Sequence, residues 1–128
     1  MILLLDTHVF LWQILGDERL KHRQKAIVND TANIVYLSAV SIFEMSTKAG
    51  IGKLDLPARY QNNLLTIYED FDFRPLPVTA AQASAAGFLV SPHRDPFDRL
   101  LAAQSIVENI PIMTVDAKIR ELGARVIW

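Results

Sequence analysis

The chain opens with four consecutive large apolar residues, Ile2 to Leu5, and an aspartate follows them directly. A strand that is apolar at every position, rather than at every second one, is typical of a parallel sheet covered on both faces. The run is far too short to cross a bilayer, which needs about 20 apolar residues. The N-terminus therefore predicts a buried strand in a sheet with helices on both sides.

Strand and helix signals alternate along the rest of the chain. Strands are expected at 1–6, 34–38, 73–79, 110–116 and 125–128, and helices at 7–16, 19–29, 39–52, 57–71, 80–88, from 96 onward and at 117–122. The prolines in 73–79 favour an edge position for that strand. This alternation predicts an α/β fold, a three-layer α/β/α sandwich with a central, mainly parallel sheet. A chain of 128 residues is expected to form a single domain, 1–128.

The composition of the chain limits its possible cellular location and its possible ligands. The chain has no cysteine, which excludes disulfides and thiolate metal sites and makes a cytoplasmic protein the expectation. No export signal is recognisable at the N-terminus, and no stretch predicts a membrane span. The formal net charge of −1 argues against bulk attraction to nucleic acid, so any polyanion has to be held locally.

Four acidic residues fall where a predicted strand ends or a predicted helix begins: Asp6, Glu44, Asp98 and Asp116. Parallel α/β sheets bind ligands at the carboxyl ends of their strands, so these carboxylates are expected to converge on one crevice. Each also fits a structural role when taken alone. Asp6 and Asp116 suit helix caps, Glu44 completes a capping box with Ser41, and Asp98 lies favourably beside the positive end of a helix dipole.

If the four carboxylates lie close together, their protonation and their affinity for cations change. Four carboxylates within a few ångström repel one another, so several stay protonated unless a cation compensates them. Oxygen ligands without thiolates favour Mg²⁺, with Mn²⁺ as a substitute, over zinc. A metal of this kind lowers the pKa of a bound water and offsets charge on phosphoryl oxygens, which suits phosphate chemistry. The acids therefore predict a magnesium site that acts on a phosphate ester.

Four stretches carry a family resemblance: LLLDTHVFLW at 3–12, LSAVSIFEMSTKAGIGKLDL at 37–56, HRDPFDRLLAAQS at 93–105 and IMTVDAKI at 112–119. In order and spacing they resemble PIN-domain ribonucleases, and among them the VapC toxins of toxin–antitoxin pairs. The resemblance implies that Asp6, Glu44, Asp98 and Asp116 are both the catalytic and the metal-binding residues.

The same resemblance implies an activity and partners. It implies an Mg²⁺-dependent endoribonuclease that is the toxin of a type II toxin–antitoxin system. Metal-activated water would hydrolyse an RNA phosphodiester and leave a 5′-phosphate and a 3′-hydroxyl. A cognate antitoxin that covers the crevice and a homodimer are implied as well.

Four further residues of these stretches lie beside the acids: Thr7, Asp95, Arg99 and Thr114. The hydroxyls of Thr7 and Thr114 either orient metal-bound water or phosphate, or make ordinary hydrogen bonds at strand ends. Asp95 is expected mainly to cap the helix that begins at Pro96, with help to the metal through water as the alternative. Arg99 is disfavoured by the helix dipole, so a partner is expected, either an internal salt bridge or an RNA phosphate.

Three other functions stay open at this point. A phosphoacceptor receiver-like module has this length and an acidic Mg²⁺ site, but calls for neighbouring acids after the first strand, where Thr7 follows Asp6. A metal-independent ribonuclease would use His8 and His93 as base and acid and leave a cyclic phosphate. In a non-catalytic module the acids only cap helices, and alanine at Asp98 would reduce stability by about 1 kcal/mol without affecting any activity.

The predicted helix at 7–16 is apolar nearly all round. Its large apolar side chains are Phe10, Leu11, Trp12, Ile14 and Leu15. Burial in the core explains the apolar residues on one face of this helix only. The apolar residues on its other faces, including Trp12, predict an exposed patch that receives a segment of a partner.

Overall fold

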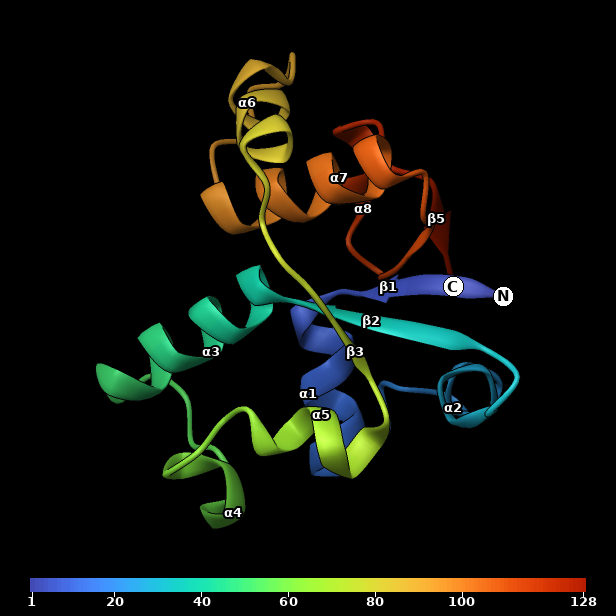
Figure 1. Ribbon diagram of the computed structural model, residues 1–128, viewed down its shortest axis with the longest axis vertical. Helices are drawn as coiled ribbons and strands as arrows, with labels where there is room; N and C mark the ends of the chain where they lie inside the picture. Colours follow the sequence, from blue (N-terminus) through green and yellow to red (C-terminus); the bar gives the residue numbers. More distant parts are fainter.

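Figure 1 shows the computed structural model, which describes residues 1–128, as a sheet between two helical layers. Its strands are β1 Ile2–Leu5, β2 Ile34–Ser38, β3 Arg74–Leu76, β4 Ile112–Met113 and β5 Val126–Ile127. All pairings are parallel, and the order is β3-β2-β1-β4-β5, so β1 is central and the proline-containing β3 is an edge strand. The predicted α/β sandwich with a parallel sheet is confirmed.

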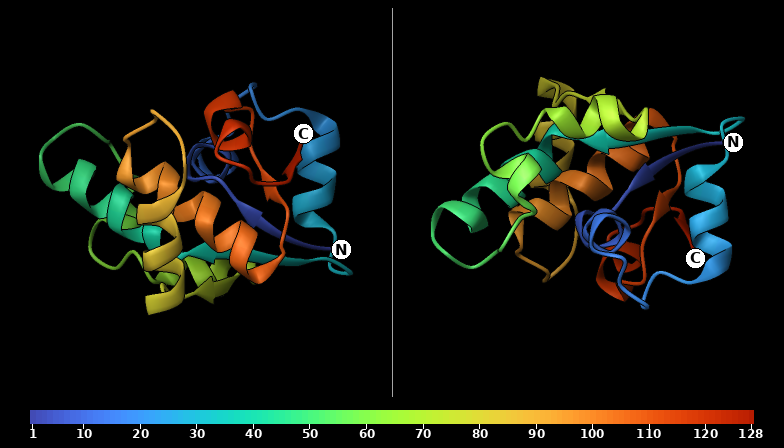
Figure 2. Two further views of the ribbon diagram at one scale, coloured as in Figure 1. Left: turned by 90° about the horizontal axis from the view of Figure 1, so that it is seen from above. Right: turned by 90° about the horizontal axis from the view of Figure 1, so that it is seen from below.

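The helices are α1 Thr7–Leu15, α2 His22–Asn29, α3 Ala39–Gly50, α4 Ala58–Gln61, α5 Thr66–Phe71, α6 Ala80–Phe88, α7 Pro96–Glu108 and α8 Ala117–Glu121. In Figure 1, α6, α7 and α8 lie on one side of the sheet, and α1 and α5 lie on the other. The views in Figure 2 show that α3 projects beyond the sheet at the end away from the N-terminus. None of the helices combines the length and the apolar composition that a membrane span requires.

Strand β1 is buried on both faces, as its sequence predicts. Leu3, Leu4 and Leu5 are each 0% exposed. Because side chains of a strand alternate between faces, Leu3 and Leu5 join the core cluster that includes α1, whereas Leu4 joins the cluster that includes α7 and α8. This burial brings the carboxyl end of β1, and the residue after it, into the interior of the molecule.

Two predicted helices differ from the structure. The single helix expected at 57–71 is wrong: α4 and α5 are separate short helices. The chain turns between them at Asn63, whose side-chain oxygen accepts the N–H of Leu65 at 3.2 Å, a local bond that competes with helix formation. Arg59 and Asp70 join the two helices through two hydrogen bonds of 2.5 and 2.7 Å. The helix expected from residue 19 begins only at His22.

The predicted exposed patch around Trp12 is also wrong. Trp12 is 8% exposed, packs edge-to-face on Trp128 at 6.1 Å, and lies under the Arg19 guanidinium at 4.9 Å. Phe10 is 0% exposed. Of the large apolar residues of α1, only Leu15 is exposed, at 53%. Other segments of the same chain therefore cover most of the apolar side chains of α1.

One buried and one exposed side chain of α1 allow a comparative test of this packing. Phe10→Ala is expected to lower the free energy of unfolding by about 3 to 5 kcal/mol, because it leaves a cavity among packed aromatic rings. Leu15→Ala is the control and is expected to change it by less than about 0.5 kcal/mol. Urea unfolding measures both values. Similar losses in the two variants would contradict the assignment of Phe10 to the core.

Candidate active site

The candidate site lies at the carboxyl edge of the sheet, where the strand order reverses. The chain places β2 and β3 on one side of β1, and β4 and β5 on the other. A crevice for ligands forms at such a switch point in open parallel sheets. Leu5 is paired with Met113 across β1 and β4, and the N–H of Asp6 donates to the Met113 carbonyl at 3.1 Å. The residues that follow these two strands are therefore neighbours.

Asp6 directly follows β1 and is 3% exposed. Although it occupies the cap position of α1, its side chain makes no capping hydrogen bond. Its Oδ2 accepts the hydroxyl of Thr114 at 2.7 Å. Burial raises the pKa of the Asp6 carboxyl above 3.8, and the charges of Asp98 and Glu44 raise it further, against the opposing effect of the Thr114 hydrogen bond and of His8. Asp6 is thus a buried carboxylate that a cation would stabilise.

Glu44 lies on α3 and is 5% exposed. Its Oε2 accepts the Lys48 ammonium at 2.5 Å, one helical turn along α3, and the Lys48 side chain is 40% exposed. The pair joins a buried carboxylate to a cation whose side chain reaches water.

The capping box predicted for Ser41 and Glu44 is not formed, because α3 begins three residues earlier than that box requires. Ser38 is the cap, and its hydroxyl accepts the N–H of Val40 at 2.9 Å. The Ser41 hydroxyl instead lies 2.8 Å from the hydroxyl of Thr7, and both residues are buried. This bond ties the first turn of α1 to α3, so the hydroxyl of Thr7 is engaged inside the protein.

Asp98 lies in the first turn of α7, which Asp95 caps. The Asp95 carboxylate accepts the N–H groups of Phe97 at 2.9 Å and Asp98 at 3.4 Å, as predicted for a cap. Nε2 of His93 lies 2.8 Å from Oδ2 of Asp98. Burial raises the pKa of the Asp98 carboxyl, the charges of Asp95 and Asp116 add to this rise, and the hydrogen bond with His93 opposes it.

Asp116 lies beyond the end of β4 and caps α8, where its Oδ1 accepts the N–H of Lys118 at 2.9 Å. The N–H of Asp116 donates to the Thr114 hydroxyl at 2.9 Å. Thr114 is 1% exposed, and its hydroxyl donates in turn to Asp6. One hydroxyl therefore fixes the acids that follow two neighbouring strands.

Arg99 does not form the internal salt bridge that was one of its two predicted contacts; its guanidinium bonds to the backbone. Its guanidinium donates to five carbonyl oxygens, those of Ala86, Gly87, Leu89, Ser91 and His93, at 2.6 to 3.4 Å. A guanidinium has five N–H donors, so all of them are used within the chain. Arg99 thus joins the end of α6 to the loop that carries His93, and the loop in turn places His93 against Asp98.

The four acids act on one another electrostatically, but their side chains do not form a finished metal site. The charges of Glu44 and Asp98 act on Asp6, and that of Asp116 acts on Asp98. As the side chains lie, no three Asp, Glu or His residues are close enough together to hold a metal ion. Each carboxylate is bonded within the chain instead: Asp6 to Thr114, Glu44 to Lys48, Asp98 to His93 and Asp116 to the backbone of Lys118.

The donor set nevertheless fits a hard cation. Each of these bonds uses one carboxylate oxygen: Oδ2 of Asp6, Oε2 of Glu44, Oδ2 of Asp98 and Oδ1 of Asp116. The second oxygen of each acid has no hydrogen-bond partner, and none of these four oxygens is among the buried unpaired atoms. Every acid therefore presents one accessible, unpaired oxygen, the ligand type that Mg²⁺ prefers.

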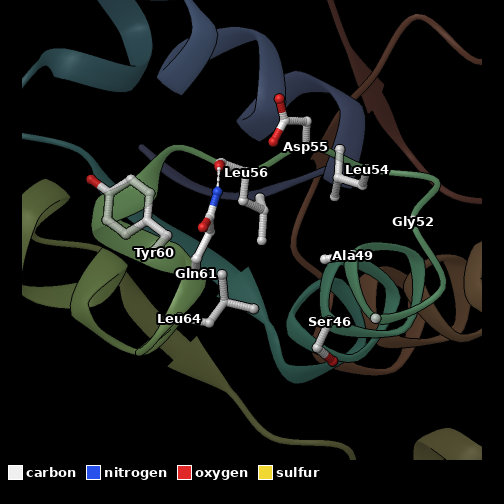
Figure 3. Close-up of a pocket in the computed structure, with 10 residues that line it drawn as sticks. Ser46, Ala49, Gly52, Leu54, Asp55, Leu56, Tyr60, Gln61 and Leu64 are labelled. Carbon is white, nitrogen blue, oxygen red and sulfur yellow. Dashed lines mark hydrogen bonds between the residues drawn. The ribbon is translucent and has the colours of Figure 1, made fainter.

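The largest cavity lies elsewhere, between the second half of α3 and the segment 52–64, and has a volume of about 640 Å³. Figure 3 shows Leu54, Leu56 and Leu64 from that segment around it, with Ser46 and Ala49 of α3. None of the four acids lines this cavity. The four acids therefore lie at the edge of the sheet and not at this cavity.

A parallel α/β sheet with carboxylates gathered at its switch point defines a class of α/β proteins with an acidic edge where ligands bind. The family model described as "PIN domain" matches residues 3–125, so the chain belongs to the PIN-domain family. PIN domains are generally nucleases and generally use a divalent metal. The family resemblance predicted from the sequence motifs is confirmed. No curated protein shows detectable similarity in sequence.

Solved structures share the fold over nearly the full length. A chain of VapBC2 from Rickettsia felis, in a complex with a DNA fragment from its promoter, has a TM-score of 0.73 and 17% identity, with 99% of this chain and 98% of that chain covered. A chain of FitAcB from Neisseria gonorrhoeae has a TM-score of 0.70 and 23% identity, with 100% and 97% covered. VapBC-1 from nontypeable Haemophilus influenzae gives 0.70 and 12%, with 99% and 97% covered.

Removal of the buried charge at Asp6 is expected to stabilise the protein when metal is absent. Because the folded pKa of Asp6 is raised, its contribution to stability is full below its ordinary pKa of about 3.8 and is lost as the pH rises through the folded pKa. Asp6→Asn is expected to unfold at higher urea concentration than the wild type at pH 7.5 in EDTA, with a smaller difference at pH 4.5. A less stable variant at pH 7.5 would contradict the buried-charge description.

Arg99 allows a second test. Arg99→Ala is expected to lower the free energy of unfolding by more than about 2 kcal/mol, because charged hydrogen bonds to several carbonyls are lost together. Hydrogen exchange is expected to rise in residues 86–94. Arg94→Ala is the control, since its exposed side chain has no hydrogen bond in the structure. Unchanged exchange in that loop would show that Arg99 does not hold it.

Proposed function

We propose that the chain is an Mg²⁺-dependent endoribonuclease and the toxin of a type II toxin–antitoxin system. The observation that carries this proposal is the group of four acids at the switch point, each with one accessible, unpaired oxygen. Membership of the PIN-domain family supports the nuclease part. The metal, the RNA substrate and the roles of individual residues belong to the proposal.

Asp6, Glu44, Asp98 and Asp116 are the residues that would hold Mg²⁺, or Mn²⁺ in its place. The bound metal lowers the pKa of a coordinated water and offsets charge on the phosphoryl oxygens. In the hydrolysis, a water oxygen bonds to phosphorus, the bond from phosphorus to the 3′ oxygen breaks, and that oxygen takes up a proton. The products are a 5′-phosphate and a 3′-hydroxyl.

The chain's own side chains hold this arrangement in place. Thr114 orients Asp6 and the backbone at Asp116 through its one hydroxyl. His93 holds one oxygen of Asp98 and leaves the other accessible. Asp95, as the cap of α7, fixes the helical turn that carries Asp98. Fixed ligands of this kind reduce the reorganisation that a reaction requires.

We also propose a cognate antitoxin that covers the acidic crevice, and a homodimer. Similar folds occur in VapBC and FitAB complexes. Large apolar side chains are exposed near the acidic edge: Phe43 on α3 is 63% exposed and packs edge-to-face on Phe97 of α7 at 5.8 Å. Phe88 is 84% exposed and Val90 is 100% exposed. Exposed apolar groups of this size favour protein partners.

Cleavage of RNA by the purified, antitoxin-free protein tests the nuclease. Activity is expected with Mg²⁺, none with EDTA, and 5′-phosphate ends on the products. Asp6→Asn and Asp98→Asn are each expected to lower the rate by more than about a hundredfold, because a ligand that offsets charge in the transition state is lost. Asp72→Asn is the control, since Asp72 is exposed and has a positive φ of 53° that asparagine tolerates.

Other outcomes would point to other functions. Cleavage in EDTA that leaves cyclic phosphates would indicate His8 and His93 as base and acid. A folded wild-type protein that binds Mg²⁺ and cuts no RNA would favour the non-catalytic or receiver-like alternative.

A further inference from the structure

Only one of the four acids has a lysine or arginine side chain as its partner. Glu44 is paired with Lys48, whereas Asp98 is paired with His93, and Asp6 and Asp116 accept hydrogen bonds from a hydroxyl and a backbone N–H. The other ion pairs, Arg19 with Asp17 and Arg59 with Asp70, lie in other parts of the chain. Lys48 is therefore the one lysine or arginine bound to the acidic site.

The two partners of this pair differ in freedom. Glu44 is held on α3 between Ser41, which is bonded to Thr7, and Met45, which is 0% exposed. The Glu44 side chain is 6% exposed, and that of Lys48 is 40% exposed. Lysine carries its ammonium on a flexible stem of four carbons. Lys48 can therefore move its charge along the edge of the site while Glu44 stays in place.

The position of Lys48 has two opposite electrostatic consequences. A positive charge beside Glu44 repels a second cation, so it weakens the binding of a divalent metal at the same acids. The same charge attracts an anion that approaches the metal, such as a phosphate.

We propose that Lys48 is a built-in cation of the acidic site, which neutralises Glu44 until a divalent metal binds and then contacts the RNA phosphate beside it. This inference rests on the proposed nuclease function and adds a substrate-binding residue to it. Lys48 thereby lowers the affinity of the site for metal and raises its affinity for the RNA substrate. Removal of the Lys48 charge is therefore expected to strengthen metal binding and to weaken RNA cleavage.

The test uses Lys48→Met, which keeps the length of the side chain and removes its charge. Titration calorimetry with Mg²⁺ and with Mn²⁺ on the antitoxin-free protein is expected to show binding that is about threefold tighter or more than in the wild type. Cleavage of a defined RNA at saturating Mg²⁺ is expected to fall by about tenfold or more in kcat/KM, since a charged contact to phosphate is lost. Lys48→Arg keeps the charge and is expected to restore both values toward those of the wild type.

Lys53→Met is the matched control, because Lys53 is exposed and has no ion pair in the structure. It is expected to change neither metal binding nor cleavage. Lys48→Met leaves Glu44 buried without its partner, so its thermal midpoint is expected to fall in EDTA and to rise more than that of the wild type when Mg²⁺ is added. If this variant does not fold without metal, Lys48→Gln supplies a neutral hydrogen-bond donor for the same titration.

Three results would overturn the inference. Weaker metal binding in Lys48→Met would mean that Lys48 prepares Glu44 for the metal rather than competing with it. Unchanged metal binding would mean that the ion pair does not act on the metal site. Tighter metal binding with unchanged cleavage would remove the contact to phosphate. Failure of the proposed function has a different signature, because a wild type that binds no metal or cuts no RNA fails in the reference measurement.

Discussion

A carboxylate buried at the end of the central strand is the constraint on which the site depends. Strand β1 is enclosed on both faces, so the residue after it, Asp6, reaches only 3% exposure. A buried, ionised carboxylate is costly unless hydrogen bonds or a cation compensate it. The hydroxyl of Thr114 supplies one hydrogen bond from the neighbouring strand end. The charges of Asp98 and Glu44 act against that bond, so the fold alone leaves the charge incompletely balanced.

Much of the fold follows directly from the sequence. The apolar run of residues 2–5 predicts a buried parallel strand because no amphipathic strand has four large apolar residues in succession. The alternation of strands and helices predicts the layers and the parallel pairing. The break in the helix expected at 57–71 was harder to predict than the strands, because the helical spacing of apolar residues continues across Asn63. At that break the Asn63 side chain accepts the N–H of Leu65, a local bond that competes with a continuous helix.

The sequence predicted that the four acids lie at one edge of the sheet, but not the groups to which each of them bonds. Asp6, Glu44, Asp98 and Asp116 stand out because they follow strands or begin helices at one edge. The hydrogen bonds of these acids change when the first residue of a helix shifts by one to three positions. Sequence patterns do not locate helix ends that closely. The predicted capping box is absent for this reason: Ser38, and not Ser41, caps α3, which begins at Ala39, and the Glu44 side chain pairs with Lys48. The spacing of four between these two residues was the available signal for that ion pair.

Capping and metal binding do not exclude each other at such a site, because a carboxylate has two oxygens. Asp116 caps α8 through Oδ1 and leaves Oδ2 accessible, while Asp98 bonds to His93 through Oδ2 and leaves Oδ1 accessible. The bonded oxygen fixes the orientation of each side chain, and the other is free to meet a cation. A residue that serves the fold with one oxygen can therefore serve a metal with the second. The structural and the functional interpretations of each acid, which compete at the level of sequence, are compatible once the individual oxygens are distinguished.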